Sequence, residues 1–177
     1  TAFALALCFS WQAVAAAQAP ILPCTGTETL IDPSFGNLDD GSHEVSLTAV
    51  FPAGLSLAGV PYTDMFINTN GNVTFGAAFT GFTPNAFPGL SQPTIAPFFA
   101  DVDLRDRLVT TNPGDVFYCV EPTNNRVMVT WSRTVHFRAT APSTDFSRVN
   151  TFQMILTAAT VCGVDGASVE FRYEDLV

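Results

Sequence analysis

Hydrophobic and polar residues alternate with a period of two along most of the chain from about Gly26 onward. This period predicts β-strands, because successive side chains of a strand point to opposite faces. In the segment 126–137 one face would carry the hydrophobic residues Val127, Val129, Trp131, Val135 and Phe137. The other face would carry Met128, Thr130, Ser132, Thr134 and His136. Arg133 interrupts the hydrophobic face and predicts a bulge, a sheet edge or a buried ion pair at that point.

Several other short segments have the composition of strands and end at glycine, proline, asparagine or aspartate. They are Glu44–Phe51, Met65–Thr69, Asn72–Phe75, Asp115–Val120, Thr151–Ala158 and Val169–Tyr173. Turn residues recur about every 8 to 12 positions, which is typical of an all-β sandwich or barrel. Asn124 and Asn125 are placed to join the segment 115–120 to the strand that starts at Arg126, as a hairpin.

One long segment lacks this alternation. Residues 76–97, GAAFTGFTPNAFPGLSQPTIAP, are rich in glycine, proline and phenylalanine. Such a composition predicts a long loop whose aromatic side chains pack over one end of a sheet. The predicted fold is therefore all-β, an antiparallel β-sandwich with a long aromatic-rich loop.

The stretch YTDMFINTNGNVTFG contains the strongest turn signal of the chain. Asn70 and Gly71 lie between two hydrophobic runs, and a type I′ hairpin turn needs the positive φ that these two residue types tolerate best. Asn72 also begins an N-x-T sequence, which is an acceptor for a glycan. That acceptor falls where the second strand of the hairpin should start.

The first residues resemble a secretory signal peptide rather than a part of the fold. A hydrophobic run from Ala2 to about Trp11 is followed by small residues in an A-x-A pattern that ends at Ala17. We expect a signal peptide over residues 1–17 whose charged start is missing, a lead over residues 18–38, and the domain over residues 39–177. A membrane anchor is the alternative, but the run is shorter than the roughly 20 residues that a span needs. We also expect that the chain is cut within a strand at its C-terminus.

Composition and charge restrict the class of partner. The chain has 177 residues, of which 47% are hydrophobic, so it can bury the core of one domain. Its formal net charge is -9 with seven lysine and arginine residues, which leaves no basic surface for phosphates. We expect no nucleic-acid partner and no direct membrane insertion of the mature domain.

After removal of the signal peptide three cysteines remain, Cys24, Cys119 and Cys162. In an oxidising compartment two of them can pair within the chain. We predict a Cys119–Cys162 disulfide, because both residues lie in or beside predicted strands, and we expect Cys24 to pair outside this segment.

Asp101 and Asp103 alternate with hydrophobic residues in the segment IAPFFADVDLR. On a strand their carboxylates would project from one face, roughly 7 Å apart. Such a pair predicts a calcium site, with Asn68 and Asn70 as the extra oxygen ligands. The alternative is that Arg105 and Arg107 neutralise the two carboxylates.

Motifs for catalysis are sparse. The chain has two histidines and no G-x-S-x-G nucleophile turn, phosphate loop or dinucleotide fingerprint. Sixteen acidic residues would provide pairs with the spacing of a glycosidase by chance. We therefore expect that the protein is not an enzyme and has no cofactor other than the calcium considered above.

A series of segments resembles a known family. In chain order they are LDDGSHEVSL, FPAGLSLAGVPYTDMFINTNGNVTFG, IAPFFADVDLR, GDVFYCV, VMVTWSRTVHF, NTFQMILT and VEFRYEDL. Together they span about Asp39 to Leu176 and are similar to the extracellular NIDO domain of nidogen, alpha-tectorin and mucin-4, which secreted bacterial proteins also carry. The resemblance implies an all-β extracellular module of a larger mosaic protein that takes part in cell and matrix adhesion. No catalytic residues come with this family.

The sequence therefore predicts a secreted, non-catalytic adhesion or cell-matrix interaction module. Its partner would be an extracellular matrix protein, a cell-surface protein or a glycan. We expect the aromatic loop to make the contact, through Phe79, Phe82 and Phe87. The alternative is a calcium-dependent carbohydrate-binding or glycan-hydrolysing domain centred on Asp101 and Asp103.

Overall fold

The computed structural model describes residues 19–31, 36–84, 90–108, 110–111, 113–139, 148–161 and 164–176. The predicted signal peptide, Phe87 and Cys162 lie outside these residues.

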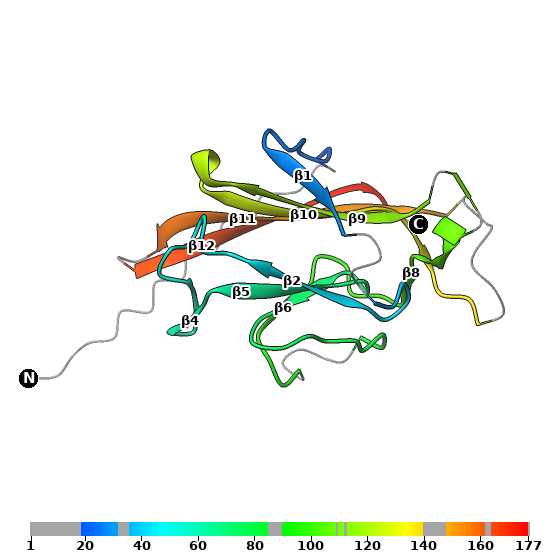
Figure 1. Ribbon diagram of the computed structural model, residues 1–177, viewed down its shortest axis with the longest axis horizontal. Helices are drawn as coiled ribbons and strands as arrows, with labels where there is room; N and C mark the ends of the chain where they lie inside the picture. The colour runs from blue at the N-terminus through cyan, green and yellow to red at the C-terminus, as the bar shows by residue number, and fades with distance from the viewer. Residues whose placement is uncertain are drawn as a thin grey trace, which may run out of the picture.

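The strands form two layers of antiparallel sheet, as Figure 1 shows. The larger sheet has the order β1 (Thr27–Leu30), β9 (Asp115–Glu121), β10 (Arg126–His136), β11 (Asn150–Val161) and β12 (Val164–Asp175), with β8 (Val102–Asp103) paired to the end of β10. The smaller sheet has the order β2 (Ser42–Ser46), β5 (Asp64–Asn68), β6 (Asn72–Thr74) and β7 (Thr94–Ile95). A separate ribbon pairs β3 (Leu55–Leu57) with β4 (Val60–Tyr62), and short 3-10 helices cover Arg105–Leu108 and Pro122–Asn124. The predicted all-β sandwich is confirmed.

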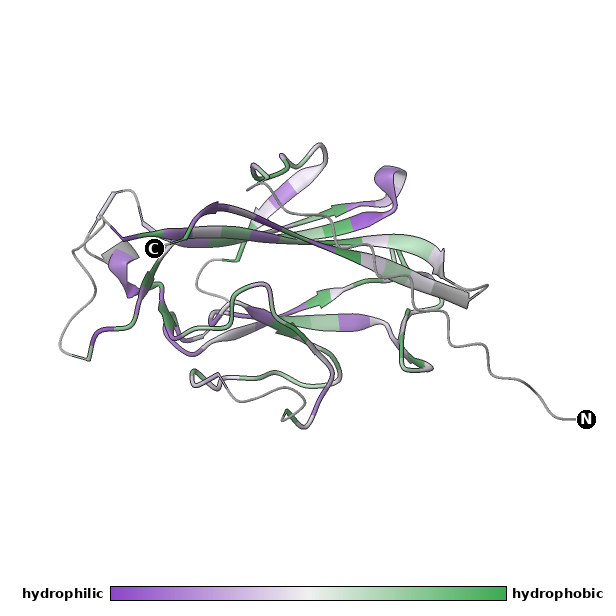
Figure 2. Cartoon of the chain, turned by 180° about the vertical axis from the view of Figure 1, so that it is seen from behind, coloured by the Kyte–Doolittle hydropathy of each residue, from purple (hydrophilic) through white to green (hydrophobic). Residues whose placement is uncertain are grey.

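The core lies between the two layers and follows the predicted alternation. Val127, Val129 and Trp131 of β10 face this core at alternate positions, and hydropathy alternates along the ribbons in Figure 2. The residues between them are buried as well, and Met128 packs with Cys119 and Ile155 in a second small cluster. Trp131 stacks on Phe152 with the ring centroids 5.1 Å apart, and its indole N–H donates to the carbonyl of Asn68 in the other sheet. Each large hydrophobic side chain buried in this way contributes about 1.5–3 kcal/mol to folding.

A bulge in β10 confirms one of the three interpretations of Arg133. The register with β11 shifts between Trp131 and Thr134, and Arg133 has a φ of 55°. Because the bulge adds a residue, Thr134 follows Trp131 in register with the inward-facing residues of β11. The predicted faces are therefore wrong beyond the bulge, although Thr134 and Val135 are both buried.

The hairpin between β5 and β6 is confirmed, but its predicted turn type is wrong. Asn68 pairs with Asn72, so the loop has three residues, and of these only Gly71 has a positive φ, at 74°. A Cβ atom at Gly71 would lie 1.8 Å from the carbonyl oxygen of Phe98. Glycine is required here by this close approach as well as by the backbone conformation.

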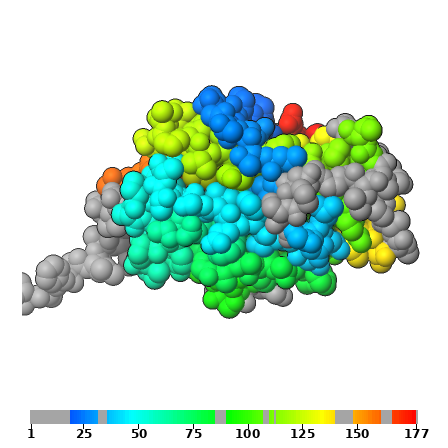
Figure 3. All heavy atoms as spheres, viewed as in Figure 1, coloured from blue at the N-terminus to red at the C-terminus, as the bar shows by residue number. Residues whose placement is uncertain are grey.

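The residues before the predicted domain are part of the larger sheet. Strand β1 pairs with β9, and Cys24 forms a disulfide with Cys119, with their Cα atoms 6.1 Å apart. The predicted Cys119–Cys162 pair is wrong, because β1 brings the supposedly loose lead alongside β9. Figure 3 shows these blue residues packed on the yellow-green surface of β9 and β10.

Glu121, at the end of β9, also holds the N-terminal lead against the larger sheet. Its carboxylate accepts hydrogen bonds from Arg126, from Asn124 (2.9 Å) and from the hydroxyl of Thr25 (2.8 Å). Burial alone would raise the pKa of Glu121, but these hydrogen bonds outweigh it and lower the pKa to about 2.

In the described part of the chain, no helix has the length and hydrophobicity that crossing a membrane requires.

Candidate functional site

Three of the residues predicted for binding, Asn70, Asp101 and Asp103, lie at the end of the sandwich that carries β8. Asn70, in the turn between β5 and β6, holds this end together through its side-chain amide. Its Oδ1 accepts a hydrogen bond from the backbone N–H of Val102 (2.8 Å), and its Nδ2 donates to Asp40 (2.9 Å) and to the carbonyl of Gly81 (3.4 Å). One buried side chain therefore fixes β8, the acidic segment 39–40 and the start of the aromatic loop.

Asp103 is fully buried and is neutralised by Arg105. The guanidinium donates through Nε to Oδ1 and through a terminal nitrogen to Oδ2, both at 2.8 Å. It also lies 4.9 Å from the ring centroid of Phe137 and donates to the carbonyl of Arg138. The hydrogen bond to Asp103 raises the pKa of Arg105 further above its ordinary value. Both carboxylate oxygens of Asp103 are thus used in a two-point ion pair.

Asp101 belongs to a different group of carboxylates. Oxygens of Asp39, Asp40 and Asp101 lie within 4.8 Å of one another. Burial, offset in part by Arg105 at 3.9 Å, raises the pKa of Asp39 to about 6. Burial and the neighbouring carboxylates of Asp40 and Asp103 also raise the pKa of Asp101. The three carboxylates are partly exposed and repel one another at neutral pH.

The predicted calcium ligands are therefore not brought together as a set. Arg105 occupies Asp103, and Asn68 points into a separate buried network. Asp101 and Asn70 do lie at the same end of the domain, through their shared neighbour Asp40. Calcium binding stays a prediction.

Asn68 and Asn72 form the buried polar network under the turn. The Nδ2 of Asn68 donates to Asn72 (2.8 Å) and Thr74 (3.2 Å), and the Oδ1 of Asn68 accepts from the backbone N–H of Phe79 (3.2 Å). Asn72 is fully buried, and its Nδ2 donates to the carbonyl of Asn70. The predicted glycosylation of Asn72 conflicts with this burial, since a glycan on that nitrogen has no space in the folded domain.

The aromatic loop starts from this same network. Phe79 packs edge-on against Phe99, with the ring centroids 5.8 Å apart. Phe82, three positions further along the loop, is 48% exposed. Of the three phenylalanines predicted for contact, Phe79 is thus an anchor of the loop and Phe82 is presented to solvent.

A pocket of about 280 Å³ lies beside the carboxylates and contains groups of both charges. Asp101, His136, Arg148 and Asn150 contribute its polar lining. No local pattern in the sequence placed Arg148 near Asp101, because 47 positions separate them and their shared pocket depends on how β11 follows β10. Among the described residues, the lining of this pocket contains no serine or cysteine.

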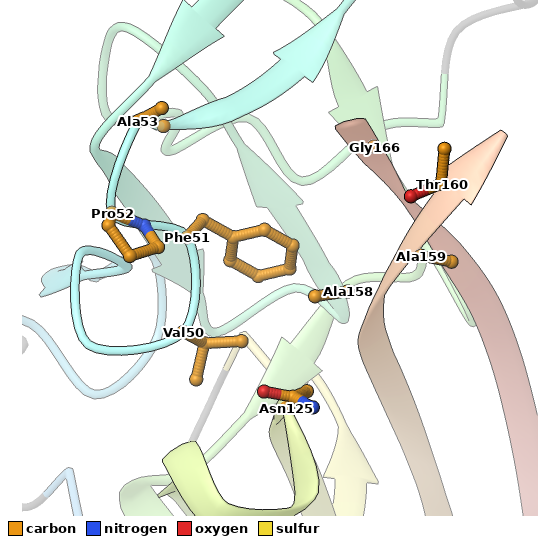
Figure 4. Close-up of a pocket in the computed structure, with 10 residues that line it drawn as sticks. Val50, Phe51, Pro52, Ala53, Asn125, Ala158, Ala159, Thr160 and Gly166 are labelled. Carbon is orange, nitrogen blue, oxygen red and sulfur yellow. The ribbon is translucent and has the colours of Figure 1, made fainter. Parts of the chain in front are cut away.

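The larger pocket, of about 420 Å³, lies away from all the predicted site residues. Figure 4 shows the ring of Phe51 directed across it towards Ala158 on β11. Half of its ten described lining residues are small, namely Ala53, Gly54, Ala158, Ala159 and Gly166. Among these described residues, side-chain polar groups come from Asn125 and Thr160.

Comparison with known proteins identifies the family. Residues 63–128 match the model of the nidogen-like domain, NIDO. The chain contains a NIDO domain. It is similar to alpha-tectorin of Mus musculus (31% identity over 135 residues) and of Homo sapiens (31% over 141 residues), in both cases over 68% of this chain. The chain spans only 6% of the length of these relatives, and no solved structure matches it significantly.

The matched region of the NIDO domain includes the whole β5–β6 hairpin, β8 and the Asp103–Arg105 pair. The predicted extracellular location is supported by this family and by the Cys24–Cys119 disulfide, because disulfides persist in oxidising compartments. The sequence did not indicate the roles of Asp39, Asp40 and Glu121. A D-D pair before a predicted strand was the available signal for the first two residues.

Proposed function

We propose that this NIDO domain is a non-catalytic module for cell adhesion or cell-matrix interaction within a larger secreted or surface protein. The match to alpha-tectorin and the disulfide-linked sandwich support an extracellular module. The partner would be a matrix protein, a cell-surface protein or a glycan.

The observation that carries this proposal is an exposed aromatic side chain on a firmly held loop. Phe82 is 48% exposed, while the loop before it is fixed by the hydrogen bonds of Asn68 to Phe79 and of Asn70 to Gly81. A rigid aromatic side chain loses little conformational entropy on binding and is a typical anchor of protein interfaces.

The state of the acidic residues supports a non-catalytic role. Asp103 and Glu121 are paired with Arg105 and Arg126 and serve the fold. Asp101 shares a pocket with His136, and the described lining of that pocket contains no serine or cysteine. The buried carboxylates of Asp103 and Glu121 are thus explained without glycan hydrolysis.

Binding of the labelled domain to decellularised matrix from cultured animal cells tests the proposal. We expect saturable binding that Phe82→Ala weakens on the order of tenfold, as truncation of an interface anchor does. Val60→Ala is the matched control, because Val60 is 49% exposed and lies on β4, outside the aromatic loop.

Two outcomes of this assay have different meanings. Absence of saturable binding to matrix and to intact cells would overturn the adhesion role. Equal binding by wild type and Phe82→Ala would overturn only the proposal that Phe82 makes the contact, and would leave the adhesion role intact. Treating the matrix separately with protease and with glycosidases distinguishes a protein partner from a glycan.

A further inference from the structure

One edge of the larger sheet is formed by strand β12, which has 12 residues. Among the described strands, β12 pairs only with β11, so its other side is an open edge. The opposite edge strand, β1, has four residues. Natural proteins usually keep an edge strand short or cover it, because its free N–H and C=O groups can pair with another strand.

The inner face of β12 leaves hydrophobic side chains exposed. Val169 and Phe171 lie opposite the core residues Leu156 and Met154 of β11, yet they are 46% and 38% exposed. Other residues of β12 do pack against the core: Ala167 and Tyr173 lie against it, and the hydroxyl of Tyr173 donates to the carbonyl of Pro97 (2.8 Å).

The outer face of the same strand carries two opposite charges two positions apart. Glu170 and Arg172 form an ion pair of 2.7 Å along the strand. The Glu170 side chain is 52% exposed, and Arg172 also donates to the carbonyl of Pro20 (3.1 Å). Arginine has five N–H donors, so these two bonds leave donors for a further carboxylate.

We propose that β12 pairs antiparallel with β12 of a second copy of this chain, with the two-fold axis at Phe171. In this register Glu170 lies opposite Arg172 of the second copy. The two-fold axis also places Arg172 opposite Glu170 of the second copy, so the charge pair forms twice. Val169 lies opposite Tyr173 and Phe171 opposite Phe171, so the exposed hydrophobic side chains cover one another. The two larger sheets then join into one continuous sheet.

The charges of β12 favour this register over its neighbours. An axis at Glu170 sets two Glu170 side chains opposite each other, and an axis at Arg172 does the same for the arginines. Like charges directly opposite destabilise a strand pair. An axis at Tyr173 runs into the irregularity that separates Tyr173 from Asp175 in the pairing with β11. A shift of one residue would bring inward-facing residues opposite outward-facing ones.

This inference is independent of the proposed matrix binding, since Phe82 lies on the aromatic loop and β12 carries none of the residues proposed for that contact. Self-association through β12 would join two copies of the domain without using Phe82.

Sedimentation velocity over a range of concentrations tests the proposal on the oxidised chain. Wild type is expected to show a concentration-dependent dimer. Glu170→Arg places two arginines opposite each other at both symmetric positions, and Arg172→Glu does the same with two glutamates. Each variant alone is expected to raise the dimer Kd on the order of tenfold or more. Glu28→Arg on β1 is the control for the change of charge, and it is expected to leave the Kd unchanged.

An equimolar mixture of Glu170→Arg and Arg172→Glu chains provides the decisive measurement. In a heterodimer both facing pairs again join an arginine to a glutamate, so association is expected to return to the wild-type Kd. The rescue shows that each variant is folded and that the register is correct. A monomeric wild type at all concentrations would overturn the proposal, as would a dimer that neither reversal weakens. Weakening without rescue in the mixture would overturn this register.

Discussion

Replacing Glu121 with glutamine tests how the N-terminal lead is held to the sandwich. The buried carboxylate of Glu121 accepts hydrogen bonds from Arg126, Asn124 and Thr25, and the disulfide of Cys24 lies beside it. Glutamine keeps the size of the side chain and removes its charge. The variant therefore isolates the charged part of the network.

The expected loss follows from the pKa of Glu121. Its folded value of about 2 lies below the ordinary 4.5, and a difference of about 2.5 units corresponds to about 3 kcal/mol at neutral pH. Because the folded pKa is lowered, this stabilisation is fully present above pH 4.5. It is lost as the pH falls from 4.5 towards about 2. Glu121→Gln should thus lower the free energy of unfolding by about 3 kcal/mol at pH 7 and progressively less in acid.

Urea unfolding at neutral pH and at several acidic pH values measures this difference under non-reducing conditions. Glu28→Gln, an exposed change on β1, is the control and should change stability by less than about 0.5 kcal/mol. An equal loss at every pH would refute the electrostatic reasoning and assign the effect to shape. No loss at neutral pH would show that the network does not stabilise the fold.

Three further predictions concern the turn, the acidic group and the disulfide. Gly71→Ala should destabilise the domain by at least about 2 kcal/mol in urea unfolding, because the added Cβ would lie 1.8 Å from the carbonyl oxygen of Phe98. Gly59→Ala is the control: Gly59 has a similar φ of 83° but open space around it, so this variant should lose about 1 kcal/mol. Asp39→Asn should stabilise the domain at pH 7 by about 1 kcal/mol after allowance for screening. Since the pKa of Asp39 is raised to about 6, wild-type stability should rise as the pH falls from 6 to 4, and the variant's advantage should vanish there; a constant advantage contradicts the reasoning. Mass spectrometry of an unreduced digest should show a Cys24–Cys119 peptide, and Cys24→Ser should cost about 2–5 kcal/mol; an intact Cys119–Cys162 peptide would contradict this pairing.

The strands that the sequence predicted are those with long, regular alternation. Segment 126–137 and the segments around residues 151–158 and 169–173 all appear, and the last two are longer than expected. Strands β3, β7 and β8 have two or three residues each, too few for alternation to be recognised. The bulge at Arg133 was visible as a polar interruption, but the change of face beyond it required the register with β11.

Some residues of the candidate site could be predicted from the sequence, but the contacts between distant residues could not. Alternation placed Asp101 and Asp103 close together, and the arginine two positions later was recognised as a possible partner. The contacts of Asn70 with Asp40 and Val102 span 30 and 32 positions. Such pairs are set by how the two sheets stack, which no local pattern encodes. The disulfide was mispredicted for the same reason, since Cys24 and Cys119 are 95 positions apart and meet because β1 pairs with β9.

The central claim is that this NIDO domain binds an extracellular partner through its aromatic loop. The binding curve of the oxidised domain on decellularised matrix, measured side by side for Phe82→Ala and Val60→Ala, tests it most directly. The account predicts saturable binding that only the Phe82 variant weakens. Binding that is absent, or that both variants weaken equally, would contradict it.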